Sequence, residues 1–132
     1  MSISYQQKII EKKEIYDKIQ KYCIEELRVW RAANSVTLAV NILHELQLHH
    51  DNFRDIQIQI TTNDQIVIKN DYYDYYLEHN KRKCYVFLLS ALKNVKKLCL
   101  KELESFNGVF SVQIALQILD WLGISDEESE IV

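Results

Sequence analysis

The residues best suited to metal or acid–base chemistry gather in the segment HELQLHHD, residues 44–51. A helical zinc site of the protease type needs two histidines four residues apart, with an acid directly after the first. His49 follows His44 by five residues, so on one helix the two rings point about 140° apart. Histidines near a helix C-terminus are also favoured by the helix dipole. We interpret the segment as an ordinary helix end, and a metal-dependent enzyme using His44–Asp51 is the weakest of three functional hypotheses.

Motifs for other catalytic chemistry are absent from the sequence. There is no glycine-rich phosphate loop, no nucleophile motif of the GxSxG type and no CxxC pair. Cys23, Cys84 and Cys99 are widely spaced at apolar helix positions, which predicts buried free thiols in a reducing compartment. We therefore expect no catalytic residue, no cofactor and no metal.

Basic residues gather in the segment 81–101, which contains no acid. Lys93, Lys97 and Lys101 have the spacing of one helix face, which could follow a phosphate backbone. This pattern gives the second functional hypothesis, a helical assembly subunit that binds nucleic acid. The net charge of −3 argues against it, and a solvated face or an acidic partner would explain the same residues. The full set is Lys81, Arg82, Lys83, Lys93, Lys96, Lys97 and Lys101.

The segment DYYDYYLEH, residues 71–79, is the most unusual feature of the chain. On a helix, Tyr72, Tyr75 and Tyr76 would share an inward side, leaving Tyr73 outside with the acids. Tyrosine gives a large contact area at a low entropic cost, so it often anchors protein interfaces. Tyrosines that pack on the rim of their own domain, with their hydroxyls in water, would explain the same pattern. If the segment binds a partner, we expect one with a basic surface, such as a nuclease channel or a nucleic-acid-binding enzyme. The predicted partner-binding residues are Asp71, Tyr72, Tyr73, Asp74, Tyr75, Tyr76 and Glu78.

The elements that position these residues are mainly helical. The chain has 132 residues, 48% of them apolar, with no proline and two glycines. Apolar periodicity predicts helices near 4–31, 35–49, 71–79, 81–106 and 111–122, with Ser35 and Ser111 as possible N-caps. No apolar run is long enough for a membrane span, and no secretory signal is evident, so we expect a cytoplasmic protein.

The apolar period changes from helical to alternating between residues 55 and 69. Ile56, Ile58 and Ile60 alternate with polar residues, and Ile66 and Ile68 repeat the pattern after a Thr-Asn-Asp turn. This predicts a two-stranded hairpin, with strands near 55–61 and 65–69, packed on the helices. The expected fold is therefore α+β and predominantly α, with about five helices and one antiparallel hairpin.

Residues 1–124 are expected to form one domain, followed by an acidic, disordered tail at 125–132. No internal repeat is apparent. Several helices are more apolar than polar around their circumference, which favours a homo-oligomer.

The leading functional hypothesis is a non-enzymatic protein-interaction module. The abundance of Ile, Lys, Asn and Tyr resembles AT-biased coding, which is common in phages, viruses and mobile elements. We therefore expect a small inhibitor, immunity or antagonist protein that covers part of the surface of its target, helped by the open hairpin edge.

Overall fold

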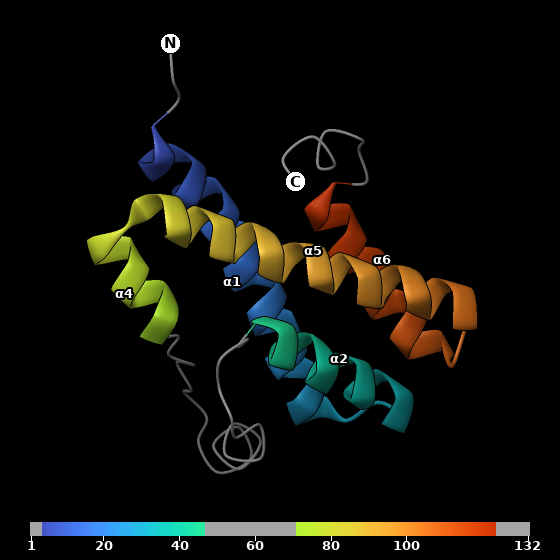
Figure 1. Ribbon diagram of the computed structural model, residues 1–132. Coiled ribbons are helices and arrows are strands. Elements are labelled where there is room, and N and C mark those ends of the chain that lie inside the picture. Colours follow the sequence, from blue (N-terminus) through green and yellow to red (C-terminus); the bar gives the residue numbers. More distant parts are fainter. Residues whose placement is uncertain (1–3, 47–70, 124–132) are drawn as a thin grey trace.

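The computed structural model describes residues 4–46 and 71–123. Across these two ranges the chain is all helical, with five helices (Figure 1). The predicted hairpin and the acidic tail lie outside the described residues. None of the five helices combines the length and the apolarity that a membrane crossing requires. The helices are α1 (Tyr5–Val29), α2 (Ala33–Leu46), α4 (Asp71–His79), α5 (Lys81–Ser105) and α6 (Val109–Leu122).

The helix boundaries follow the sequence pattern, except at the starts of α2 and α6. Ser4 caps α1, because its hydroxyl accepts the N–H of Gln6 at 3.1 Å. The predicted caps at Ser35 and Ser111 are wrong, since α2 begins at Ala33 and α6 at Val109. The two serines lie in the first turn, where each hydroxyl donates to a buried glutamate carboxylate.

The core lies where α1, α2, α5 and α6 pack as a four-helix bundle, with α4 against the beginning of α5 (Figure 1). Each bundle helix contributes fully buried apolar side chains, among them Ile19, Leu43, Leu88 and Ile118. The side-chain hydroxyl of Tyr16 donates to the carbonyl of Leu46, which ties α1 to the end of α2. Apolar burial of this kind is the main favourable contribution to folding.

The three cysteines are free and buried, as predicted. Burial raises the pKa of Cys84 to about 11 and that of Cys99 to about 12. Burial also raises the pKa of Cys23, and the nearby Cys99 adds to the effect. A thiol that stays protonated at neutral pH is a poor nucleophile, so these side chains act as core residues.

Two consecutive helix pairs have the same dimensions, which the sequence analysis did not recognise. Helices α1 and α5 both have 25 residues, and α2 and α6 both have 14. Each residue of the first pair has an equivalent 76 positions later in the second. Equivalent positions hold the same residue at Lys21 and Lys97, Cys23 and Cys99, Glu26 and Glu102, Leu27 and Leu103, Ser35 and Ser111, Val36 and Val112, Ala39 and Ala115, Ile42 and Ile118, Leu43 and Leu119, and Leu46 and Leu122.

The bundle is thus two copies of one helical hairpin, and the expectation of no internal repeat is wrong. The shared residues include both buried serines and two of the three buried cysteines, so the copies resemble each other inside the core. Helix α4 has no equivalent among the described residues, and it is the main departure from the twofold arrangement (Figure 1).

Candidate protein-binding surfaces

Helix α4 lies at one end of the bundle, separated from α5 by Asn80 alone (Figure 1). The backbone N–H of Asn80 donates to the carbonyl of Tyr76 at 2.7 Å, which ends α4. The Asn80 side chain accepts the N–H of Lys83 at 3.2 Å, which begins α5. One residue therefore fixes the turn between the two helices.

The orientation of α4 differs from the one predicted for its tyrosines. Tyr73 is buried at 8% exposure, whereas Tyr75 is 60% exposed and Tyr76 is half-buried. The ring of Tyr73 lies 4.9 Å from the Lys13 ammonium of α1, and burial raises the pKa of Tyr73 to about 12. Neighbouring helices decide which side of α4 is covered, and the pattern of α4 by itself does not contain that information.

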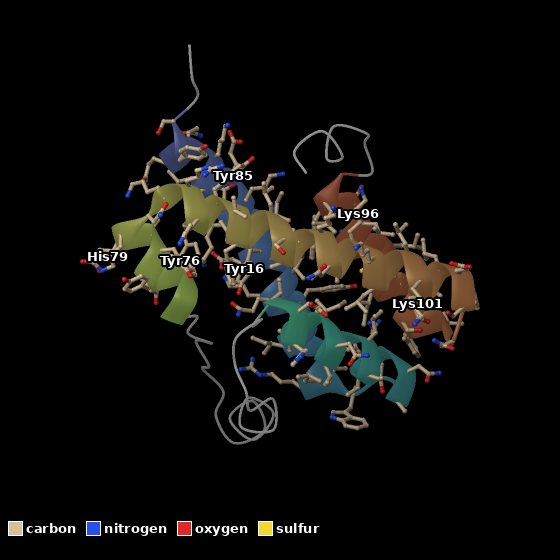
Figure 2. The ribbon with its side chains drawn as sticks, viewed as in Figure 1. Tyr16, Tyr76, His79, Tyr85, Lys96 and Lys101 are labelled. Carbon is tan, nitrogen blue, oxygen red and sulfur yellow. The ribbon has the colours of Figure 1, made fainter. Side chains whose placement is uncertain are left out.

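The exposed side of α4, which we call the α4 face, consists of Asp74, Tyr75, Glu78 and His79. The Tyr75 ring lies 4.5 Å from the ring of His79 and 5.7 Å from that of Tyr76, which it meets edge-on. These contacts restrict the Tyr75 side chain while leaving most of it in solvent. Figure 2 shows Tyr76 and His79 on this helix. The predicted residues Asp71 and Tyr72 belong to α4, but their side chains lie outside the described part.

The predicted basic residues separate into two groups along α5. At its beginning, Lys81 donates to the carbonyl of Leu77 at 3.1 Å, and the Lys83 ammonium lies 5.9 Å from the Tyr76 ring. These two lysines therefore support α4, and Arg82 beside them is exposed.

The second basic group lies further along α5, where Figure 2 labels two of its members, Lys96 and Lys101. Lys93, Lys97 and Lys101 are exposed, and Lys96 is half-buried. Among the described residues, no carboxylate forms an ion pair with Lys93, Lys97 or Lys101. The helical spacing thus produces an exposed lysine strip.

The histidine segment is described only in part. His44 is exposed and Glu45 is half-buried at the end of α2, while His49, His50 and Asp51 lie outside the described residues. Within residues 4–46 and 71–123, no three His, Cys, Asp or Glu side chains are grouped so as to hold a metal ion.

The turn between α1 and α2 is organised by a buried glutamate that the sequence analysis missed. Glu26 is 5% exposed, and its Oε1 accepts from Arg31 Nη2 at 2.7 Å and from Arg31 Nε at 2.9 Å. Its Oε2 accepts from the Ser35 hydroxyl at 2.6 Å. Burial alone would raise the pKa of Glu26, but the hydrogen bonds from Arg31 and Ser35 and the arginine charge lower it.

The turn between α5 and α6 repeats this arrangement around Glu102, which is 7% exposed. Its Oε2 accepts from the Ser111 hydroxyl at 2.8 Å and from the backbone N–H of Asn107 at 3.0 Å. Its Oε1 accepts from the Asn107 side chain at 3.1 Å. We call these two arrangements the turn clasps. Their shared signal in the sequence is a glutamate, an aromatic residue four positions later and a serine nine positions later.

The two turns contact each other through equivalent positions. The Asn34 amide donates to the carbonyl of Asn107 at 2.7 Å. Asn34 is equivalent to Phe110 of the second turn, and Asn107 is equivalent to Arg31 of the first. In this second pair the Arg31 guanidinium lies 4.7 Å from the centre of the Phe110 ring. The same contact therefore occurs twice with different chemistry, as expected for a pseudo-twofold axis between the turns.

Comparison of the chain with protein-family models, curated proteins and solved structures finds no match.

Proposed function

We propose that this protein acts by binding another protein through the α4 face. The observation that carries the proposal is the exposed, laterally supported ring of Tyr75, which is 60% exposed beside Tyr76 and His79. A restricted aromatic side chain loses little entropy on binding, so it suits the centre of an interface.

Charge on the α4 face favours a target with a basic surface. Asp74 and Glu78 are exposed one helical turn apart, in the row next to Tyr75. Opposite charges on a partner would steer its approach and fix its orientation, while the tyrosine would supply most of the affinity. A small protein that covers a basic site in this way would act as an inhibitor, immunity or antagonist protein. The predicted hairpin at 55–69 precedes α4 in the chain, and its strand edge would extend the contact.

Affinity capture from the cells that make the protein tests this proposal. Wild-type bait should retain a partner that is lost with Tyr75→Ala and with the double change Asp74→Lys and Glu78→Lys. Leu116→Ala on α6 is the matched control, since Leu116 is 52% exposed and lies outside the α4 face. A partner retained equally by all four baits would contradict the proposed surface.

The exposed lysine strip supports a second candidate function, nucleic-acid binding. Lys93, Lys97 and Lys101 lie on one face of α5 without an ion-pair partner among the described carboxylates. Binding to random oligonucleotides should then fall steeply between low and physiological salt, and charge reversal at the three positions should abolish it. Binding that is absent at low salt would exclude this candidate.

A further inference from the structure

The two turns lie at the end of the bundle opposite α4 (Figure 1). Several of their apolar side chains are exposed. We call Val29, Trp30, Phe106, Val109 and Phe110 the turn face. Trp30 is 58% exposed, and Phe106 and Val109 are each 62% exposed. Its three aromatic side chains leave on the order of 300 Å² in solvent, at roughly 200 Å² for each complete side chain. Patches of this size on a protein surface are often functional.

Trp30 and Phe106 both adopt left-handed backbone conformations, with φ of 54° and 52°. This region costs a residue with a side chain about 1 kcal/mol or more, and glycine would occupy it without that cost. The two repeats nevertheless both place an aromatic residue here. Strain that is retained at equivalent positions indicates that the side chains have a role outside the fold.

The segments that carry the turn face are almost free of charge. Residues 29–43 and 105–119 contain one charged residue, Arg31, in a chain of which 27% is charged. Arg31 is paired with the buried Glu26 at 2.7 Å. Interface centres are depleted in charge and enriched in aromatic residues, which is the composition found here. A suitable partner surface is therefore apolar and uncharged, and the turn face itself has these properties.

The border of the turn face carries opposite charges on the two repeats. Arg28 and Glu104 occupy equivalent positions and are both exposed, and Arg28 lies 4.0 Å from Glu25 of its own chain. If a second copy packs with its α5–α6 turn on the α1–α2 turn of the first, Arg28 faces the partner's Glu104. Because such a contact is twofold symmetric, the attraction occurs twice. If the α1–α2 turns of the two copies packed on each other instead, the two Arg28 side chains would lie together and repel. Charge therefore favours the first register.

We propose that a second copy of this chain packs on the turn face in this register, forming an end-to-end homodimer. Trp30 of each copy then lies against the partner's Phe106, and Arg28 lies near the partner's Glu104. This surface is separate from the α4 face and does not depend on the proposed function.

Sedimentation velocity of the full chain over a range of concentrations tests the aromatic part of the contact. Wild-type protein should show a concentration-dependent dimer. Trp30→Gly and Phe106→Gly should each raise the dimer dissociation constant on the order of a hundredfold, since each change removes two central contacts per dimer. Glycine suits the left-handed backbone, so both variants should fold. Tyr75→Ala on the α4 face is the control and should leave the dimer unchanged.

A charge exchange tests the register. Arg28→Glu alone and Glu104→Arg alone should each weaken the homodimer roughly tenfold, because like charges then meet twice. Mixing the two single variants should restore wild-type affinity as a heterodimer, because opposite charges meet again. A chain that stays monomeric up to about millimolar concentration, a dimer insensitive to both glycine variants, or a mixture no tighter than either variant alone would each overturn the proposal.

Discussion

The two turn clasps bury the same carboxylate with different donors. Glu26 accepts hydrogen bonds from the charged side chain of Arg31, whereas Glu102 accepts them from the neutral side chain and the backbone N–H of Asn107. Both carboxylates also accept a hydrogen bond from a serine hydroxyl. A buried carboxylate in a helical hairpin therefore requires enough hydrogen-bond donors, and a cation is one of several ways to supply them.

The largest difference between the clasps should appear when the variable donor is removed. Arg31→Met leaves Glu26 with Ser35 as its remaining side-chain donor, so we expect a loss of about 2–3 kcal/mol in the free energy of unfolding. Asn107→Leu should cost about 1 kcal/mol, because the backbone N–H and Ser111 still bind Glu102. Urea denaturation at pH 7 measures both losses.

Arg82→Met is the control for that pair, since it removes an exposed arginine outside either clasp and outside the turn face. It should change the free energy of unfolding by less than about 0.5 kcal/mol. Equal losses for Arg31→Met and Asn107→Leu would mean that the arginine charge contributes nothing beyond its hydrogen bonds.

The clasp of Glu26 should also make stability depend on pH. Its pKa is lower in the folded chain than in the unfolded chain, because the hydrogen bonds and the charge of Arg31 outweigh burial. The stabilisation is therefore complete above the unfolded pKa, about 4.3, and is lost as the pH falls through the folded value. Glu26→Gln should flatten the acid side of the stability profile measured by urea denaturation between pH 7 and 3. An unchanged acid slope in this variant would exclude Glu26 as its source.

Much of the described fold could be predicted from the sequence. Apolar periodicity located the five helices, because each buries one face and the spacing of apolar residues records that face. It also placed the three cysteines in the core. The direction of α4 could not be obtained in this way, since the surroundings of Tyr73 include Lys13 of α1, a residue far away in the sequence.

The internal repeat was not evident in the sequence because the first halves of the two long helices differ in residue type. Leu88 of α5 is fully buried and Leu89 is half-buried, whereas the equivalent residues of α1 are Lys12 and Lys13. Different surroundings selected different residues in the first halves of the long helices. The similarity persists near the turns, where the clasps impose the same requirement on both copies. There Ser111, which resembles an N-cap in type and position, instead serves Glu102.

Removal of the serine hydroxyl should have a smaller effect on stability, and one that is similar in the two clasps. Each hydroxyl is buried and donates to the carboxylate, so Ser35→Ala and Ser111→Ala should each cost about 1 kcal/mol. Ser105→Ala is a control, because its hydroxyl is exposed and donates to the Lys101 carbonyl at 2.9 Å, away from either carboxylate of the clasps. Thermal or urea unfolding would reveal the losses. A markedly larger effect at Ser35 would show that the clasps are not equivalent in their shared part.

The smallest effect is expected at Gly108, which is equivalent to Ala32 in the first repeat. Its φ of −175° is extended and open to any residue, so the first repeat's alanine is compatible with the backbone. A Cβ at Gly108 would lie 3.2 Å from the Asn34 amide nitrogen, which donates to the Asn107 carbonyl. Gly108→Ala removes freedom from the unfolded chain, a gain of about 0.4–1 kcal/mol, but disturbs a hydrogen bond of similar worth.

The two effects should nearly cancel, leaving a change within about 0.5 kcal/mol for Gly108→Ala alone. In an Asn34→Ala background the crowding is gone, so the same change should stabilise the protein by about 0.4–1 kcal/mol. A double-mutant cycle by urea denaturation measures the difference as a coupling energy. No coupling between the two positions would mean that the turn has room for the methyl group, and that contact with Asn34 does not explain the glycine in the second repeat.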